Sequence, residues 1–336
     1  MKKVFTTAWL ILIVIVQPSL AQTVTKSAKV GNSIYELVYN NKDNSVYVAT
    51  TRGNAEKPTI YQLSADDLSV KDSIVLQTAA FGLGINQVTQ TLYGTATRGG
   101  GVVPVDLKNK KELPLISNGT EESHTREVVV DEANNKIYVS DVRGGVWVID
   151  GKTNTFSHML KGIAGATGLA INPKVERLYA ISKNKVIFYA LRADVIIDSF
   201  TTGGEGAINL VLDTKRNHLF VSHQGSGTVT VLDAENGSLL KTIPAGDGAL
   251  GITYSPEKDR VFVANRGAGS VTIINAADYS VADNVVSGSL PNTVVTDDKG
   301  NAYISNKAKG GGRPKPGEKP QPSNDPDGDM VIKISL

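Results

Sequence analysis

Short runs of alternating or β-branched apolar residues, separated by polar turns, recur along the chain from about residue 22 onward. The clearest unit places apolar strands at 207–213, 218–222, 228–233 and 238–243, with Asn and Gly concentrated in the turns between them. Strands of four to seven residues punctuated by Asn, Gly and Asp are typical of antiparallel hairpins. No segment after residue 22 has a sustained helical period. The pattern therefore predicts an all-β protein.

This four-strand unit repeats seven times. In each copy the second strand carries an aromatic residue between apolar neighbours: Tyr47, Tyr93, Tyr138, Tyr179, Phe220, Phe262 and Tyr303. Their successive spacings are 46, 45, 41, 41, 42 and 41 residues. A period of about 40–45 residues that holds four strands is the signature of a β-propeller blade. We predict a seven-bladed β-propeller with four-stranded blades, in one domain over residues 22–336.

The two ends of the chain indicate how the ring closes. The last unit stops after its third strand, at 331–336, whereas residues 24–30 precede the first complete unit and align with a fourth strand. We expect the N-terminal strand to pair into the last blade. Such closure shelters the radial faces of both terminal blades, while every blade keeps a short outer edge.

The N-terminus has the features of a secretory signal. Lys2 and Lys3 precede an apolar run at about 8–16, and Pro18 and the small-residue segment 19–21 follow it. This arrangement predicts a signal peptide over residues 1–21 and hence an exported, periplasmic protein. A membrane anchor is the alternative, but the apolar run is shorter than the roughly 20 residues that a spanning helix needs.

Composition narrows the possible chemistry. The chain has no cysteine, which excludes disulfides, a lipid-modified cysteine and a thiolate nucleophile. Its formal charge is +2, and removal of Lys2 and Lys3 with the signal peptide would bring it to zero. A generic polyanion binder usually carries a net basic excess. An anion site in this protein must therefore come from local placement of charge, and we expect a monomer without a cofactor.

A resemblance to a known family adds to this interpretation. Residues 261–265 followed by 269–275 resemble the YVTN-type propeller repeat. Further matches to the YncE family of periplasmic seven-bladed propellers are Tyr35-Glu36, the segment 81–92, Arg126-Glu127 and the terminal segment 331–334. The resemblance covers essentially the whole chain after residue 21. It implies a periplasmic, non-catalytic binding protein, with single-stranded nucleic acid as one suggested ligand class, but no short motif of that family defines ligand residues.

Aligned repeats place one residue just beyond the second strand of each blade, on the face that also carries the links between blades. Gln224 occupies this position in one unit, and the other six are cationic: Arg52, Arg98, Arg143, Lys183, Arg266 and Lys307. Charged side chains are common at solvated hairpin tips, so a solubilising rim is one interpretation. The other is a ring of positive potential that focuses an anionic ligand even at zero net charge.

A second aligned pair of positions begins each innermost strand, at the mouth of the central channel. Glycine recurs there because the inner ring is crowded. The aromatic and polar exceptions are Tyr35, Glu36, Phe81, Arg126, Glu127, Asn209 and Asn292. The polar members could simply pair with each other, as buried polar groups must. Alternatively, the two aromatic rings beside the cationic positions could stack the bases of a single strand.

The segment 309–329, between the last two strands, is rich in Gly, Pro and Lys. We expect it to be a disordered loop within the last blade that acts as a tether, a loose cover or a neutral spacer. Asp325, Asp327 and Asp329 alternate like metal ligands, but the distal glutamate of a calcium loop is missing. We predict no metal site.

Catalysis finds little support in the sequence. The four histidines lack metal-ligand spacing, and no serine lies in a nucleophile elbow. We therefore predict a non-catalytic exported propeller that binds an anionic ligand, single-stranded nucleic acid or a partner protein through one face. One alternative is a lactonase-like enzyme acting on sugar lactones or sugar phosphates, for which Glu36, Arg126 and Glu127 are the candidate acid–base groups. Another is an envelope scaffold with protein partners only.

Overall fold

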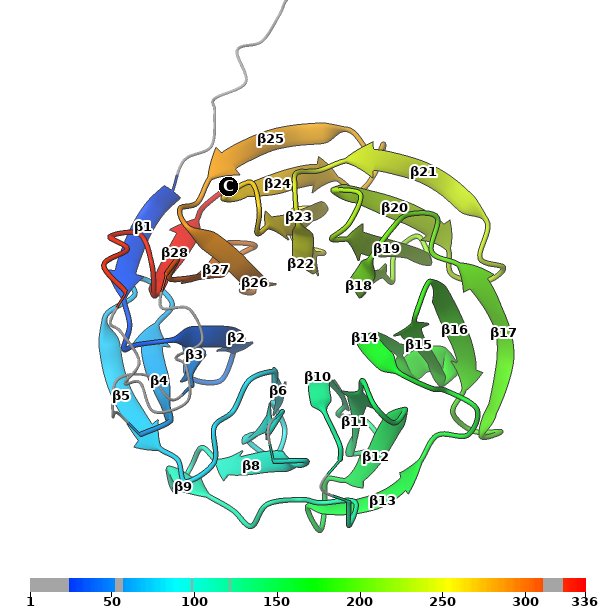
Figure 1. Cartoon of the computed structure of the whole chain (residues 1–336), viewed down its shortest axis with the longest axis horizontal. Coiled ribbons are helices and arrows are strands. Elements are labelled where there is room, and N and C mark those ends of the chain that lie inside the picture. The colour runs from blue at the N-terminus through cyan, green and yellow to red at the C-terminus, as the bar shows by residue number, and fades with distance from the viewer. Residues whose placement is uncertain (1–23, 52–56, 98, 121, 311–322) are drawn as a thin grey trace, which may run out of the picture.

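The protein is a ring of radial β-sheets around a central axis (Figure 1). The computed structural model describes residues 24–51, 57–97, 99–120, 122–310 and 323–336. These residues form seven antiparallel sheets of four strands each, and one short 3-10 helix, η1 (Pro173–Val175). The prediction of a seven-bladed β-propeller is confirmed.

Each blade runs from an innermost to an outermost strand. Blade 1 comprises β2 (Ile34–Asn40), β3 (Ser45–Thr50), β4 (Thr59–Ser64) and β5 (Val70–Val75). Blade 2 comprises β6 (Leu83–Asn86), β7 (Thr91–Thr95), β8 (Val102–Asp106) and β9 (Lys111–Glu112). Blade 3 comprises β10 (Thr125–Asp131), β11 (Lys136–Asp141), β12 (Val146–Asp150) and β13 (Thr155–Met159). Blades 4 and 5 comprise β14 (Ala166–Asn172), β15 (Arg177–Ser182), β16 (Lys185–Ala190) and β17 (Val195–Thr201); and β18 (Ala207–Asp213), β19 (His218–His223), β20 (Thr228–Asp233) and β21 (Leu239–Pro244). Blades 6 and 7 comprise β22 (Ala249–Ser255), β23 (Arg260–Asn265), β24 (Ser270–Asn275) and β25 (Val281–Val286); and β26 (Leu290–Thr296), β27 (Ala302–Lys307), β28 (Met330–Ile334) and β1 (Val24–Lys29).

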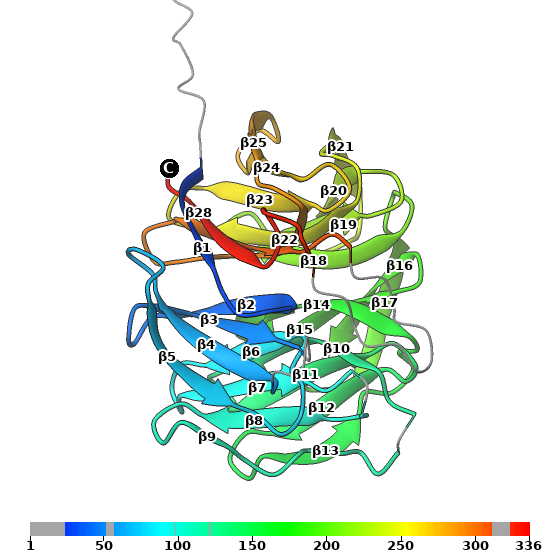
Figure 2. The same ribbon diagram turned by 60° about the vertical axis from the view of Figure 1, so that its left-hand side comes forward.

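The ring closes through the N-terminal strand. In blade 7 the strand order is β26-β27-β28-β1, and β1 pairs antiparallel with β28, with Ser27 opposite Ile332. Figure 2 shows β1 lying along β28 at the edge of the ring. One more backbone hydrogen bond, from Val30 N to Asp329 O at 3.1 Å, extends this pairing. The expected closure is confirmed.

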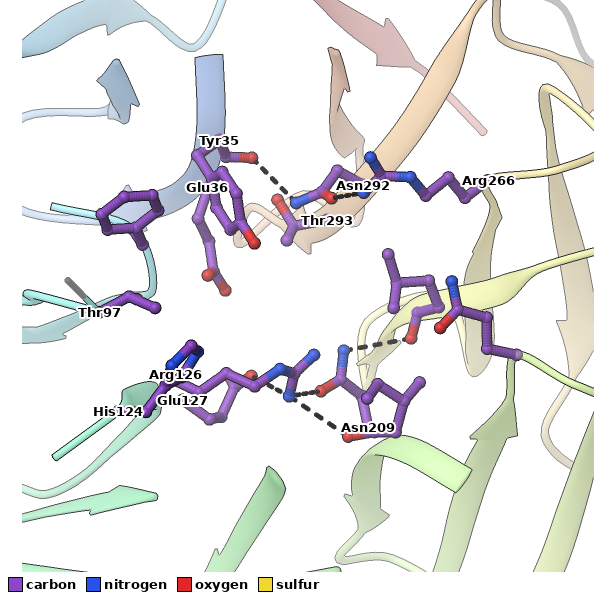
Figure 3. Close-up of a pocket in the computed structure, with 14 residues that line it drawn as sticks. Tyr35, Glu36, Thr97, His124, Arg126, Glu127, Asn209, Arg266, Asn292 and Thr293 are labelled. Atoms are coloured by element: carbon purple, nitrogen blue, oxygen red, sulfur yellow. Dashed lines mark hydrogen bonds and ion pairs between the residues drawn. The ribbon is translucent and has the colours of Figure 1, made fainter. Parts of the chain in front are cut away.

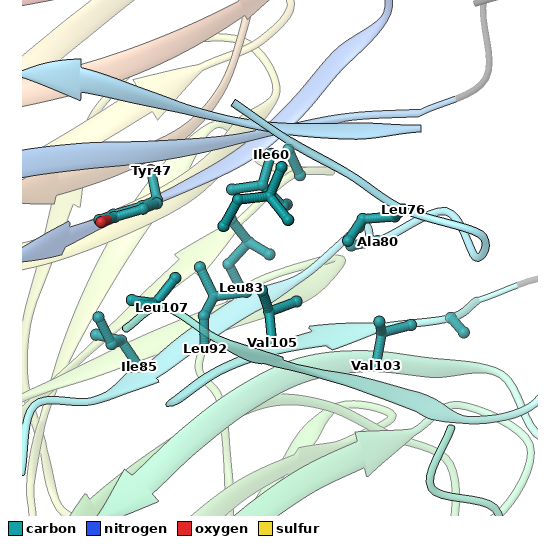
Figure 4. Packing of buried hydrophobic residues seen from close by; sticks show 13 residues of the cluster. Tyr47, Ile60, Leu76, Ala80, Leu83, Ile85, Leu92, Val103, Val105 and Leu107 are labelled. Atoms are coloured by element: carbon teal, nitrogen blue, oxygen red, sulfur yellow. The ribbon is translucent and has the colours of Figure 1, made fainter. Parts of the chain in front are cut away.

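The hydrophobic core lies between the faces of neighbouring blades. Figure 4 shows one such cluster, in which Tyr47 and Ile60 of blade 1 pack with Leu83, Leu92 and Val105 of blade 2. The repeating aromatic residues of the second strands are all buried, from fully buried Tyr93 to Tyr138 at 6% exposure. Burial of an aromatic side chain contributes a large hydrophobic stabilisation. The aromatic residue therefore repeats in the sequence because each blade packs it against its neighbours.

Aspartates at the ends of the third strands hold the turns that follow. Asp106 Oδ1 accepts the backbone N–H of Lys108 at 2.9 Å, and Asp233 Oδ1 accepts that of Glu235 at 2.7 Å. Trp147 is fully buried in β12 and donates from Nε1 to Asp141 Oδ2 at 3.1 Å. These groups serve the framework.

The residues of the predicted signal peptide lie outside the described part of the chain. Among the residues that are described, no helix has the length and apolar character required to span a bilayer.

Candidate ligand site at the mouth of the central channel

A cavity of about 240 Å³ opens where the innermost strands begin, at one end of the central axis (Figure 3). Much of its wall consists of residues at the first of the two aligned positions predicted at the start of each innermost strand: Tyr35, Phe81, Arg126, Ile208, Leu250 and Asn292. These side chains come from six different blades. The repeat thus brings residues that are far apart in the sequence to one rim.

Irregular strand pairing helps to present these residues. The register between β2 and β3 shifts between Ile34 and Leu37, and that between β10 and β11 shifts between Thr125 and Val128. The pairs Tyr35-Glu36 and Arg126-Glu127 fall within these two shifts. A β-bulge bends its strand and re-aims side chains, and such bulges are common beside functional sites. The innermost strands of blades 4 to 7 carry a similar shift at the same level.

Hydroxyl groups tie several blades to the next blade at this level. Thr95 Oγ1 donates to Arg126 O at 3.2 Å, and Ser140 Oγ donates to Thr167 O at 2.7 Å. Ser305 Oγ donates to Tyr35 O at 2.7 Å and so links the last blade to the first. Because each acceptor is the backbone of a mouth residue or of its aligned neighbour, these bonds position the rim.

Large and small residues alternate around the ring one position further along each strand. Blades 1, 3, 5 and 7 supply a polar side chain at this position: Glu36, Glu127, Asn209 and Thr293. Blades 2, 4 and 6 supply glycine: Gly82, Gly168 and Gly251. A Cβ atom on Gly168 would lie 2.7 Å from Asn209 Cα, and one on Gly251 would lie 2.6 Å from Asn292 O. Glycine thus allows the backbone of the neighbouring blade to approach closely.

Several polar side chains of the mouth bond to one another across the channel. Arg126 Nη1 donates to Asn209 Oδ1 at 2.9 Å and to Ile208 O at 3.3 Å, which joins blade 3 to blade 5. Arg266 Nη1 donates to Asn292 Oδ1 at 2.6 Å, and Asn292 Nδ2 donates to Tyr35 O at 3.2 Å. These bonds pre-organise both guanidinium groups at the cavity (Figure 3).

The two aromatic residues of the mouth form a compact pair with a cation beside it. The rings of Tyr35 and Phe81 meet edge to face, with centroids 5.1 Å apart. Lys307 Nζ lies 3.8 Å from the centroid of the Tyr35 ring, a cation–π geometry. Because the two rings are perpendicular, they do not form a continuous stacking platform.

Two carboxylates, Glu36 and Glu127, lie deeper in the channel. Burial raises the pKa of Glu36 well above its usual value, the charge of Glu127 raises it further, and Arg126 partly opposes both effects. Burial also raises the pKa of Glu127, and Arg126 opposes that shift. Arg126 Nη1 is 3.9 Å from Glu127 Oε2. Like charges that share a low-dielectric site favour retention of a proton.

His124 lines the same cavity beside Arg126. Burial lowers the pKa of its imidazole, the charges of Arg143 and Arg126 lower it further, and Asp141 opposes them. The neutral ring is therefore favoured, and it can offer one donor and one acceptor to a ligand.

Comparison with known proteins places the chain in context. No family model matches it. It is 30% identical over 233 residues to the protein YncE of Escherichia coli O157:H7, and 29% identical over the same length to YncE of Salmonella typhi. This chain is a homologue of YncE. The match covers 64% of the chain and 66% of the relative, just under two thirds of its length, and the relatives are described as uncharacterized proteins.

A solved structure supports the fold. Hydrazine synthase of Kuenenia stuttgartiensis aligns with a TM-score of 0.72 at 15% identity, over 83% of this chain and 94% of that one. The likeness concerns the propeller fold alone. The YncE resemblance predicted from Tyr35-Glu36, the segment 81–92 and Arg126-Glu127 is confirmed as homology to YncE.

The predicted cationic residues of this YncE homologue differ in location: some lie at the cavity and others are exposed on the rim. Arg266 lines the cavity, and Lys307 lies against Tyr35. Arg143 and Lys183 are exposed at turns, and neither is among the residues that line the cavity. Arg52 and Arg98 lie outside the described residues. Of the four described members, two therefore gather at the mouth and two lie on the open rim.

Sequence reasoning did not single out several residues that line the mouth. Thr97 and His124 belong to loops, and Gln224 was noted only as the uncharged member of the aligned turn position. Ile208, Leu250 and Thr293 belong to the aligned positions at the start of the inner strands, so for these three the repeat was a usable signal. For Thr97 and His124 there was none, because neither lies at the aligned positions that the repeat singled out.

The ends of the predicted loop 309–329 are anchored to the ring. Asp325 Oδ1 accepts Ser289 Oγ at 2.6 Å, and Asp325 Oδ2 accepts Lys309 N at 2.6 Å. Asp329 Oδ1 accepts Ile34 N at 3.1 Å. Residues 311–322 lie outside the described part. In the part that is described, no group of three or more His, Asp or Glu side chains has an arrangement that could hold a metal ion.

Proposed function

We propose that this YncE homologue is an exported, non-catalytic binding protein whose site is the mouth cavity of the propeller, and that the site takes the anionic group of a small ligand. The observation that carries the proposal is the convergence of Arg126, Arg266 and Lys307, from blades 3, 6 and 7, on one cavity and its aromatic wall. Cations at the end of a narrow channel focus the field on an incoming anion.

The guanidinium groups retain capacity for a ligand. The hydrogen bonds described above engage Nη1 of Arg126 and Nη1 of Arg266. A guanidinium has five N–H donors in a planar fork that suits carboxylate and phosphate oxygens. Because each group is already held by an asparagine, little further side-chain entropy is lost when an anion binds.

The size of the cavity favours a small molecule over a flat macromolecular surface. About 240 Å³ accommodates a metabolite-sized group, slightly below the usual range for drug-sized pockets. The edge-to-face arrangement of Tyr35 and Phe81 also favours an enclosed ligand over a run of stacked bases.

The test compares Arg266→Gln with Arg143→Gln. Both remove one cation from the same aligned position, but only Arg266 lines the cavity. We expect 4-methylpentanoate and inorganic phosphate, titrated by calorimetry, to bind Arg266→Gln about tenfold more weakly, a loss of about 1.4 kcal/mol. Arg143→Gln should bind like the native protein.

Equal affinities for the two variants would contradict the proposal. Turnover of a sugar lactone that Glu127→Gln abolishes would replace it with an enzyme. If crosslinking in the native envelope captured specific proteins while both anions failed to bind, the scaffold alternative would be favoured.

A further inference from the structure

A second cavity adjoins the mouth cavity. It has a volume of about 190 Å³, lies along the same channel and shares four lining residues with the first: Glu36, Glu127, Asn209 and Thr293. We call these four the girdle. Beyond the girdle most of the lining residues are aliphatic. Val38, Ile252 and Val295 are partly exposed, whereas Leu37 and Leu210 pack into the core between blades.

The girdle is rich in acceptors. It has two carboxylates, and the side chain of Asn209 uses its oxygen for Arg126 and its nitrogen for Leu250 O. Arg126 Nη1 lies 3.9 Å from Glu127 Oε2, and its charge also acts on Glu36. One guanidinium, already bound to Asn209, thus faces two carboxylates. Figure 3 shows Glu36 extending into the cavity from β2, toward the side from which Arg126 approaches.

The channel therefore presents three zones in order: cations at the mouth, carboxylates at the girdle and aliphatic side chains within. An aliphatic α-amino acid carries the complementary sequence of groups, namely a carboxylate, an ammonium on the neighbouring carbon and an apolar side chain. The cations would pair with the carboxylate and the girdle carboxylates with the ammonium, while the apolar side chain would lie in the inner cavity.

We propose that the girdle binds the ammonium group of an aliphatic α-amino acid whose carboxylate lies at the mouth and whose side chain enters the inner cavity. The inference deepens the proposed function, because it rests on the same site and names the class of its anionic ligand. Burial and then the charge of Glu127 raise the pKa of Glu36, which is consistent with the proposal, since an ammonium between the two carboxylates would offset that repulsion.

The experiment uses four matched probes. L-leucine carries all three groups, 4-methylpentanoate lacks the ammonium, 3-methylbutylamine lacks the carboxylate, and 2-hydroxy-4-methylpentanoate replaces the ammonium by a hydroxyl. Each is titrated into the native protein, Glu36→Gln, Glu127→Gln and the control Glu205→Gln. Glu205 is exposed on the link before β18, so its variant has the same net charge as the girdle variants without altering the channel.

We expect leucine to bind native protein at least about tenfold more tightly than the three other probes. Glu36→Gln and Glu127→Gln should each remove this preference for the ammonium without weakening the binding of 4-methylpentanoate, whereas Glu205→Gln should leave every affinity unchanged. Thermal unfolding identifies any variant that does not fold, and the two girdle variants test the same contact independently.

The inference is overturned if leucine binds no better than the hydroxy acid, or if both girdle variants keep the preference. In those cases binding of 4-methylpentanoate that depends on Arg266 would leave the proposed function standing. Failure of leucine, of both acids and of inorganic phosphate to bind would remove both proposals together.

Discussion

At the scale of single residues, Glu36 is a carboxyl in a place where ionisation is unfavourable. Burial and the nearby charge of Glu127 raise its pKa, and Arg126 offsets only part of the effect. At pH values between the pKa of Glu36 in the unfolded chain and its higher pKa in the folded protein, the folded protein therefore holds the Glu36 proton more tightly than the unfolded chain does. This contribution to the stability of the folded protein is complete at pH values below the pKa in the unfolded chain. It is lost as the pH rises through the pKa in the folded protein.

Glu36→Gln should consequently stabilise the protein at alkaline pH, because the amide has no charge to desolvate. We expect a gain of about 1 kcal/mol at pH 8, a modest figure because the side chain is partly exposed. The gain should vanish once the native carboxyl is fully protonated. Urea unfolding across the acidic to alkaline range, with Glu205→Gln as control, measures it. A Glu36→Gln protein less stable than the native protein at pH 8 would contradict the argument.

At the scale of elements, β1 has an unusual role, because the strand is mostly exposed and yet completes blade 7. Thr25 Oγ1 donates to Lys333 O at 3.0 Å, and the neighbouring Val30 is 1% exposed. The strand supplies the outer edge of a sheet whose other three strands come from the far end of the chain. Its contacts therefore tie the two termini together.

Deletion of residues 22–30 should open this closure. The loss of the β1–β28 ladder and of buried Val30 should cost at least about 2 kcal/mol and lower Tm by several degrees. Differential scanning calorimetry measures the shift, and Ser27→Ala, which keeps the backbone ladder, is the control. An unchanged Tm in the deletion protein would show that blade 7 does not depend on β1.

At the scale of the whole molecule, the cationic positions divide into an inner pair and an open rim. Arg266 and Lys307 lie at the cavity, whereas Arg143 and Lys183 are exposed. The full chain has a formal charge of only +2, so no general basic field supplements them. A long polyanion would have to follow the rim, and a small anion would need only the mouth.

Replacement of Arg98, Arg143 and Arg266 together by glutamine distinguishes binding of a long polyanion along the rim from binding of a small anion at the mouth. We expect the variant to fold normally. A nucleic-acid site on the rim predicts that it binds a twelve-nucleotide oligothymidylate more weakly than Arg266→Gln alone does. For the native protein, log affinity should fall with log salt concentration with a slope of about −0.7 for each phosphate contacted. Fluorescence anisotropy at two salt concentrations is sufficient. An affinity equal to that of the single variant would exclude a rim site for nucleic acid.

Much of the site was predictable because a repeat relates its parts. Tyr35, Arg126 and Asn292 occupy one aligned position, and a ring of equivalent blades must bring such positions to one end of the axis. The alternation of Gly168 and Gly251 with larger residues was also visible in the sequence. The contact between Arg126 and Asn209 was not, because it spans two blades and depends on side-chain length and conformation.

The sequence alone determined the number of blades, the closing strand and the end of the channel where the candidate site lies, since each follows from a period imposed by packing between neighbouring blades. Only the tertiary structure decided which cations reach the mouth, that Glu36 and Glu127 share one channel with Arg126, and that a second cavity lies beneath them. These features depend on contacts across the ring. Local periodicity carries no information about such contacts, because they join residues that no repeat relates.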